Sequence, residues 1–216
     1  MRGLLLFVLL FASSVLFYGQ KEFQDFETWY RFKLSKKIGD IRVHVKPGVR
    51  LYENSTQLKS MLSDFGASYK VHKYFGTTFN YRYSLKNKFD LGNSPSHRLN
   101  LDLNSDVDVG ELNVKLRNRT QMDSDYRGLD WANRTKLALT YDVGEGIAFF
   151  TSTEAWVVLE SLSYLSKYRI SFGLEIDLAK RNAVEIFYRR QALLNEKVPT
   201  KSNIIGIAYK LKLKSS

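Results

Sequence analysis

A two-residue alternation of apolar and polar side chains runs through most of this sequence, and it is clearest between Tyr168 and Leu178. In that segment the even positions are apolar or aromatic, whereas the odd positions carry Arg, Ser, Gly, Glu and Asp. Because successive side chains of a β-strand point to opposite faces, the segment predicts a strand with one apolar and one charged face. Its length also matches the roughly 9–11 residues that a tilted strand needs to cross a bilayer.

Similar segments recur from Asp25 almost to the C-terminus, and the period-two template finds about eleven of them. From Asn54 onward, short turns roughly alternate with longer connections, as in outer-membrane barrels with short periplasmic turns and longer external loops. The sequence therefore predicts an all-β fold, an antiparallel up-and-down transmembrane β-barrel of roughly 10–12 strands. Bacterial barrels usually have an even number of strands, so roughly ten or twelve is expected rather than eleven.

The alternation itself leaves open which face of each strand lies inside. A membrane barrel turns its apolar face outward, whereas a soluble lipocalin-like barrel turns it inward. Here the apolar faces are long, many carry Tyr or Phe near their ends as an interfacial girdle would, and the opposite faces carry both signs of charge. These observations favour the membrane barrel over the alternative, a soluble periplasmic β-barrel binding protein.

Residues 1–20 have the organisation of a cleaved signal peptide, in which Arg2 precedes an apolar run from Leu4 to Leu16. That run is short for a membrane-spanning helix, and no later stretch approaches about 18 uncharged apolar residues. The sequence thus predicts an exported protein whose residues 21–216 form one outer-membrane β-barrel domain in a Gram-negative bacterium.

The net charge of +11 does not by itself indicate nucleic-acid binding. The cations are dispersed, many alternate with apolar residues inside predicted strands, and there is no basic helix or tail. With no Cys, neither a disulfide framework nor a thiolate metal site is available. The predicted partners are therefore outer-membrane lipid, lipopolysaccharide and other outer-membrane proteins, and not nucleic acid.

The polar faces of the predicted strands supply a candidate charge network for the interior of the barrel. Its residues are Arg82, Arg98, Asp102, Arg117, Arg134, Glu154, Arg169, Glu175, Glu185 and Arg189. Both signs occur on neighbouring strands, so mutual neutralisation in a largely occluded lumen is favoured. The excess of cations leaves a narrow anion-preferring channel as the alternative.

The stretch from Ala155 to Leu165 is the most apolar of the predicted loops. As an external loop it would offer a surface for a partner, with Trp156, Leu159, Leu162 and Leu165 as candidate contact residues. This loop is the main sequence feature that points to an interaction role.

Asp102, Asn104, Asp106 and Asp108 are spaced two apart and resemble the start of a calcium loop. The glycine at Gly110 is misplaced for an EF-hand, however, and a polar strand face that runs into a turn explains the same spacing. No metal and no cofactor are therefore predicted.

Two other patterns have simple explanations. His97 lies beside Ser94 and Ser96, as a Ser-His-acid site would require, but it shares the parity of apolar strand positions, which favours an interfacial histidine. Asn118–Thr120 and Asn133–Thr135 match the glycosylation sequon, which carries little weight in a bacterial protein. No catalytic residues are predicted, and His97 is the weak candidate.

Three segments carry a resemblance to a known family: Gln24–Tyr30, Lys167–Arg169 and Phe187–Gln191. Together with the strand, turn and strand around His72–Phe75, they resemble the bacterial family catalogued as domain of unknown function 2490. The resemblance implies an outer-membrane-type barrel of unassigned activity, with no catalytic residues to carry over. The positions that match the inward polar pattern of the family are Trp29, Arg98, Arg134, Glu154, Arg169 and Arg189.

The sequence favours a non-enzymatic structural or interaction component with a charged, largely occluded lumen. The anion-preferring channel, an outer-membrane lipid-modifying enzyme that uses His97, and the soluble binding protein are the alternatives. These hypotheses assign different roles to the candidate charge network inside the barrel and to the Ala155–Leu165 segment.

Overall fold

The computed structural model describes residues 23–88, 92–126, 128–159, 163–195 and 200–214, and in these residues it contains eleven strands and no helix. The predicted signal peptide, residues 1–20, lies outside the described residues. The strands are β1 (Phe23–Ile38), β2 (Ile41–Tyr52), β3 (Gln57–Lys70), β4 (Phe75–Lys88), β5 (Gly92–Val109), β6 (Leu112–Asp125), β7 (Gly128–Gly144), β8 (Ile147–Val158), β9 (Tyr164–Ala179), β10 (Asn182–Leu193) and β11 (Thr200–Lys212). No helix in the described part of the chain is long and apolar enough to cross a membrane.

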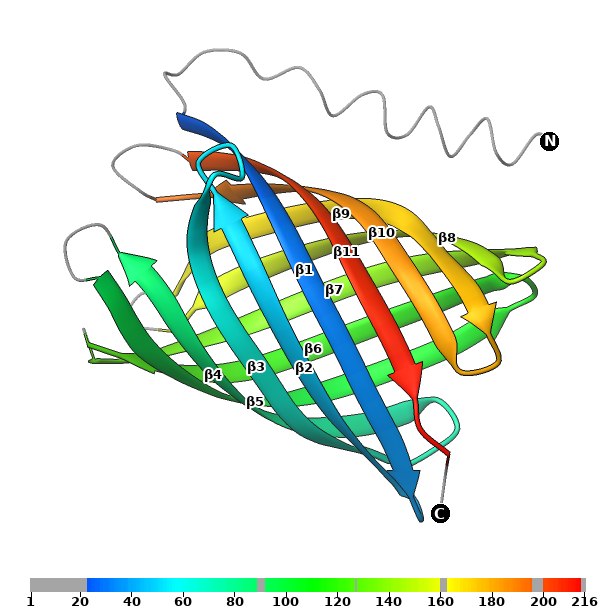
Figure 1. The fold of residues 1–216 in the computed structure, drawn as a ribbon. Coiled ribbons are helices and arrows are strands. Elements are labelled where there is room, and N and C mark those ends of the chain that lie inside the picture. The colour runs from blue at the N-terminus through cyan, green and yellow to red at the C-terminus, as the bar shows by residue number, and fades with distance from the viewer. Residues whose placement is uncertain (1–22, 89–91, 127, 160–162, 196–199, 215–216) are drawn as a thin grey trace.

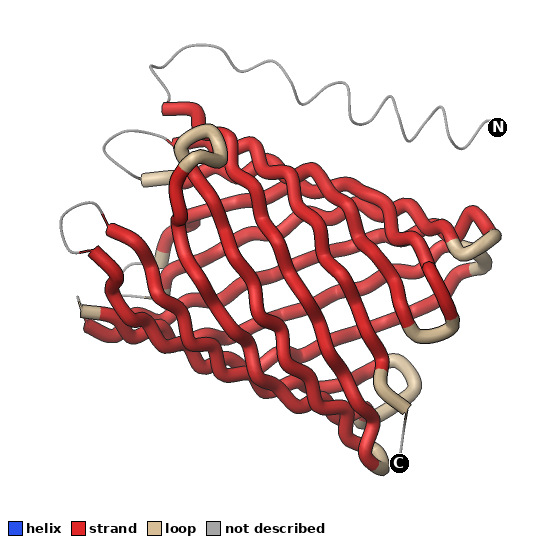
Figure 2. The backbone as a smooth tube through the Cα atoms, viewed as in Figure 1, coloured by secondary structure: helices blue, strands red, loops and turns tan. Residues whose placement is uncertain are grey.

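The strands close into one barrel (Figures 1 and 2), which confirms the predicted fold class. Each strand pairs antiparallel with the next along the chain, as an up-and-down barrel requires. The even strand number expected from bacterial barrels is wrong for this chain. An odd number of strands can close only with one parallel pair, and β1 supplies it by pairing with β11 from Phe23↔Thr200 to Ser35↔Lys212.

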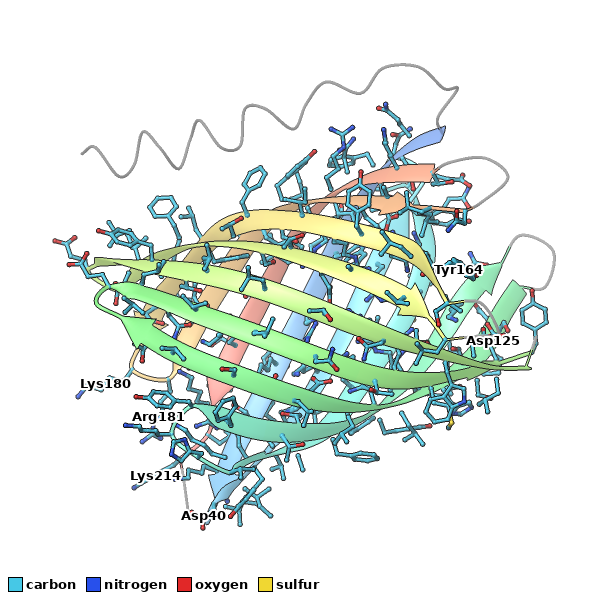
Figure 3. All side chains as sticks on the ribbon, turned by 180° about the vertical axis from the view of Figure 1, so that it is seen from behind. Asp40, Asp125, Tyr164, Lys180, Arg181 and Lys214 are labelled. Carbon is cyan, nitrogen blue, oxygen red and sulfur yellow. The ribbon has the colours of Figure 1, made fainter. Side chains whose placement is uncertain are left out.

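The parallel closure places the start of β1 and the end of β11 at opposite ends of the barrel (Figure 1). We call these the N-terminal end and the C-terminal end. Connections at the C-terminal end span residues 39–40, 71–74, 110–111, 145–146 and 180–181. Those at the N-terminal end span residues 53–56, 89–91, 126–127, 159–163 and 194–199. Figure 3 shows Asp40, Lys180, Arg181 and Lys214 at the C-terminal end, and Asp125 and Tyr164 at the other.

Several strands extend further toward the N-terminal end than the sequence indicates. The residues from Asn118 to Asp125 belong to β6, and those from Gly128 to Trp131 belong to β7. Most of the predicted Ala155–Leu165 loop likewise belongs to β8 and β9. The alternation of polarity fades where outward positions such as Asn118 and Thr120 are polar, whereas backbone pairing continues through them.

The interior of the barrel is polar and its outer wall is apolar. Among the described residues, the buried positions comprise 20 polar or charged side chains and nine hydrophobic ones. Large apolar side chains are exposed on the outside, for example Phe65 on β3 and Phe172 on β9. This arrangement is the reverse of a soluble barrel, whose apolar faces pack together in the centre.

A small apolar cluster inside the barrel connects the first strand with the last two strands. Trp29 of β1, Phe187 of β10 and Ile204 of β11 are buried against one another, with Phe150 packed beside them. Gly206 makes room for this cluster, because a Cβ atom there would lie 2.1 Å from Cζ of Phe187. These contacts hold the parallel β1–β11 pair and fix Trp29 inside the lumen.

Candidate functional site

A central cavity of about 370 Å³ occupies the lumen and is lined by side chains from ten strands, β1 to β10. Three carboxylates line this central cavity, Asp64, Asp123 and Glu154. The 14 cations that line it are Arg31, Lys46, Arg50, Lys59, Arg82, Lys86, Arg98, Arg117, Arg119, Arg134, Lys136, Lys167, Arg169 and Arg189. The sequence places these residues here because they share the parity of inward-facing positions on their strands.

Each carboxylate of the central cavity is held by arginine. Asp64 accepts two hydrogen bonds from Arg82, at 2.5 and 2.8 Å. Asp123 accepts one from Arg98 at 2.5 Å. Hydrogen-bonded pairing of this kind offsets part of the cost of burying opposite charges.

Glu154 has the largest share of the ion pairs. Its Oε1 accepts hydrogen bonds from Arg117 at 2.5 Å and from Arg134 at 2.8 Å. Its Oε2 lies 3.7 Å from Nη1 of Arg169. One carboxylate therefore faces three guanidinium groups from β6, β7 and β9, and it cannot neutralise all of them.

Six cations of the central cavity have no ion pair with a carboxylate among the described residues. They are Arg31, Lys46, Arg50, Lys136, Lys167 and Arg189. In addition, the buried Nε atoms of Arg117 and Arg134 find no hydrogen-bond acceptor in the described part of the chain. The central cavity thus offers both positive charge and N–H donors.

Two indole rings lie against cations of the central cavity. The guanidinium carbon of Arg50 lies 4.1 Å from the ring centre of Trp29, and those of Arg134 and Arg169 lie 4.3 and 4.5 Å from that of Trp156. Cation–π contacts attract the cations but leave their charge unneutralised. Trp29 is itself fixed, because its Nε1 donates a hydrogen bond to Glu27 at 2.8 Å.

All ten residues of the predicted charge network lie on inward-facing positions. Beyond those described above, Asp102 pairs with Arg119 at 2.5 and 2.6 Å. Glu175 and Glu185 both pair with Lys210, at 2.8 and 2.7 Å, nearer the C-terminal end. Sequence reasoning missed Asp64, Arg119, Asp123 and Lys210, although strand parity identifies each as inward-facing.

Trp156 does not belong to the predicted loop surface. Trp156 lies in β8 with 5% exposure inside the lumen, not in an external loop. Leu159 and Leu165 are exposed at the N-terminal end, and Leu162 lies outside the described residues. The sequence predicts a loop here because the inward Trp156 and the outward Val157 are both hydrophobic. Two apolar neighbours hide the alternation that marks a strand.

His97 and its neighbouring serines lie on opposite faces of β5. The His97 ring is exposed on the outer wall, and its Nδ1 lies 2.8 Å from the hydroxyl oxygen of Tyr81. Ser94 and Ser96 are buried on the inward face. The structure therefore does not assemble a Ser-His-acid site at His97.

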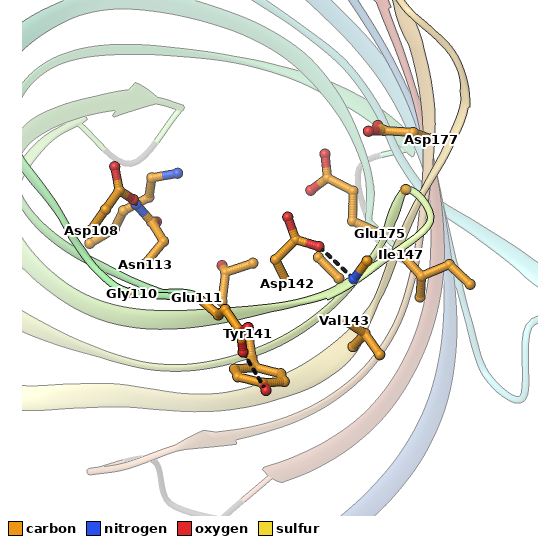
Figure 4. A pocket seen from close by; sticks show the side chains of 15 residues that line it. Asp108, Gly110, Glu111, Asn113, Tyr141, Asp142, Val143, Ile147, Glu175 and Asp177 are labelled. Carbon is orange, nitrogen blue, oxygen red and sulfur yellow. Dashed lines mark hydrogen bonds between the residues drawn. The ribbon is translucent and has the colours of Figure 1, made fainter.

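A second cavity, of about 790 Å³, lies at the C-terminal end beside β5 to β9 (Figure 4). It is acidic: Asp108, Glu111, Asp142, Glu175 and Asp177 line it together with Lys115. We call it the acidic end cavity. Figure 4 shows Asp142 bonded to the backbone N–H of Gly144 and Tyr141 bonded to Glu111.

The aspartate row that resembles a calcium loop is occupied by protein partners. Asp106 and Asp108 accept hydrogen bonds from Nδ2 of Asn113, at 2.6 and 2.5 Å, and Asp102 binds Arg119. Within the described residues, no group of three or more His, Cys, Asp or Glu side chains is placed to hold a metal ion.

Comparison with known proteins identifies one family. A family described as "Protein of unknown function (DUF2490)" matches residues 26–201. All six residues assigned to the inward polar pattern by resemblance face the lumen in the structure. No curated protein sequence matches the chain.

One solved structure is similar in its fold, the outer-membrane expressed OmpT of Vibrio cholerae. The two chains are 10% identical, with a TM-score of 0.41. The similarity covers 71% of this chain and 54% of that chain, so the protein spans about half the length of its structural neighbour.

Proposed function

Because the chain belongs to the DUF2490 family of proteins of unknown function, we propose a function from its geometry alone: an outer-membrane barrel whose basic central cavity binds small anions. The observation that carries this proposal is that six of the 14 cations around the central cavity have no carboxylate partner among the described residues. The ligands that fit are small oxyanions such as phosphate, sulfate or carboxylates.

The outer wall supports the membrane location. Leucine, isoleucine and aromatic side chains face outward along the strands, and exposed aromatic residues occur near both ends. Tyr69, Tyr141 and Phe149 lie toward the C-terminal end, and Tyr126, Trp131 and Tyr164 lie toward the N-terminal end. Such girdles mark the two membrane interfaces of transmembrane barrels. The shorter connections at the C-terminal end would face the periplasm, and the external loops would contact lipid and lipopolysaccharide.

Charge in an enclosed lumen supports anion binding. Like charges without counter-ions repel strongly where water is scarce, and their burial is costly unless they are paired. Six cations that lack a carboxylate within the described residues would gain from an anion. Arginine side chains also suit oxyanions, since their planar N–H groups match two oxygens at once.

The location and the ligand can be tested separately. Membrane fractionation with heat-modifiable gel mobility tests the barrel in the outer membrane, and a freely soluble mature protein would contradict it. Calorimetric titration of the detergent-purified protein with inorganic phosphate tests the ligand, and we expect saturable binding that weakens as ionic strength rises. An Arg50→Gln, Arg189→Gln variant should lose that binding, and unchanged binding would exclude the central cavity as the site.

A second candidate function is an anion-preferring channel, favoured by the cations that surround the lumen on ten strands. Planar-bilayer recordings under a potassium chloride gradient would show a reversal potential shifted toward that of chloride. A barrel that binds phosphate but shows no conductance is a binding protein with an occluded lumen, which removes the channel and keeps the first proposal.

A further inference from the structure

A group of polar side chains lies in the middle of the outer wall, where the other strands present apolar residues. The two Asn-Arg-Thr segments, which match the glycosylation sequon, form its centre. In the antiparallel register of β6 and β7, Asn118 faces Thr135 and Thr120 faces Asn133. Arg119 and Arg134 between them are buried toward the lumen. The alternation of a strand therefore turns both asparagines and both threonines outward.

The neighbouring strand β8 extends this group. Thr153 lies opposite Leu137 and Thr151 opposite Leu139, so both threonines share the outward face of β7. We call the six residues the Asn/Thr patch: Asn118, Thr120, Asn133, Thr135, Thr151 and Thr153. Exposed apolar side chains surround it, among them Leu101, Leu103 and Leu137.

The Asn/Thr patch is only partly satisfied by its own hydrogen bonds. Asn118 and Asn133 exchange two amide hydrogen bonds of 3.0 Å, and Asn118 also donates to the Thr135 hydroxyl at 3.1 Å. The second N–H of Asn133 and the hydroxyls of Thr120 and Thr153 have no partner among the described residues. In hydrocarbon, unpaired polar groups are costly, and in membranes such groups form hydrogen bonds between protein surfaces.

We propose that the Asn/Thr patch is the interface through which two copies of this chain associate in the membrane. Amides and hydroxyls both donate and accept hydrogen bonds, so two identical patches can pair with each other. The patch carries no charge, and therefore two copies brought face to face do not repel. A two-fold axis along the membrane normal would join them, as in the isologous interfaces of most homodimers.

The small size of its side chains also suits a close contact between two walls. Thr135 lies at the centre of the patch and faces Ala155 across the β7–β8 pair. Asn, Thr and Ala leave a low surface, whereas the opposite wall on β1 to β3 carries larger exposed residues such as Tyr30 and Phe65. Small residues at membrane interfaces let two backbones approach closely.

Cysteine cross-linking in membranes tests this interface, because the natural chain has no Cys. Thr135→Cys at the centre of the patch should form a disulfide-linked dimer on mild oxidation. Val45→Cys, which also faces outward but on β2 at the far side of the barrel, is the matched control and should remain monomeric. Cross-linking of Thr135→Cys to a different protein, or equal cross-linking of both variants, would overturn the proposal.

A second variant separates loss of the interface from loss of the fold. Asn118→Leu with Asn133→Leu removes the amides and keeps an outward surface compatible with lipid. We expect heat-modifiable mobility to be retained and self-association in nanodiscs to weaken at least tenfold. A wild-type protein that is monomeric, or a variant that dimerises as well as wild type, would contradict the proposal.

This inference rests on the proposed membrane location, and the two can fail separately. A mature protein recovered in the soluble fraction refutes the location itself. A protein that is recovered in the outer membrane but stays monomeric refutes only the dimer.

Discussion

The central cavity and the acidic end cavity carry opposite charge, and the acidic one lies nearer the C-terminal end of the barrel. In the central cavity, 14 cations and three carboxylates line one space inside the barrel. At the C-terminal end, five carboxylates and Lys115 line a cavity that opens at the mouth of the barrel. Solvent and salt screen exposed charges within about 10 Å at 0.1 M ionic strength, whereas enclosed charges are screened far less.

An excess of one sign of charge is expected to have different consequences in the two cavities. The acidic end cavity loses little stability by its own repulsion, because water and salt ions screen it. Under the proposed function, the cations inside the barrel would be screened less, and those without a carboxylate partner would bind anions. An anion would also meet repulsion at the acidic end, which favours entry from the N-terminal end.

The greatest change in stability is expected at a carboxylate of the central cavity. Glu154→Gln removes the charge that faces Arg117, Arg134 and Arg169. We expect a loss of about 3–5 kcal/mol in unfolding free energy, because buried cations lose their partner. Urea unfolding in detergent measures it, and added phosphate should restore part of the loss through binding to the folded state.

The matched control for that change is Glu111→Gln in the acidic end cavity. Glu111 accepts a hydrogen bond from the exposed Tyr141 at 2.7 Å. Its replacement should alter the unfolding free energy by about 0.5 kcal/mol or less. Equal losses for the two variants would show that the central cavity is as well screened as the open end.

The next effect concerns the aromatic support of the central cavity. Trp156→Ala removes a buried ring that lies beneath Arg134 and Arg169, and we expect destabilisation of about 3 kcal/mol. Leu159→Ala, at an exposed position just beyond β8, should cost about 0.5 kcal/mol or less. Thermal unfolding measures the stability of both variants. If Trp156 lay in an exposed loop, Trp156→Ala would cost as little as Leu159→Ala.

The mildest change concerns one cation of the central cavity, Arg50. Arg50 has no carboxylate partner in the described residues, so Arg50→Gln should leave stability unchanged or slightly raised. Phosphate affinity should fall about tenfold, which corresponds to about 1.4 kcal/mol. Lys115→Gln at the acidic end is the control, and a similar fall there would mean that the cavities do not differ in anion affinity.

The sequence predicts the strands and their inward faces well because both depend on local alternation. Tyr168–Leu178 lies within β9 as expected, and Trp29 and Arg134 face the lumen by parity. The alternation cannot predict the parallel β1–β11 pair, since that contact joins residues about 180 positions apart in sequence and depends on the total strand number.

Individual partners in the lumen are equally hard to predict. Asp64 and Arg82 lie opposite each other only because β3 and β4 pair in one particular register. The sequence predicts the position of Trp156 wrongly, because an inward aromatic residue among apolar neighbours has the same sequence pattern as an apolar loop. The predicted signal peptide, the domain range 21–216 and the proposed partners remain predictions.

Fluorescence from the three tryptophans of this chain can test both which side chains face the lumen and which sign of charge the lumen carries. Trp131 is exposed on the outer wall, and Trp29 and Trp156 are buried in the lumen. In a Trp131→Phe variant reconstituted in bilayers, fluorescence from the two lumen tryptophans should be quenched several-fold more by iodide than by caesium, and not by brominated lipid. Equal quenching by both ions, or quenching by the lipid, would contradict a basic lumen enclosed by a lipid-facing wall.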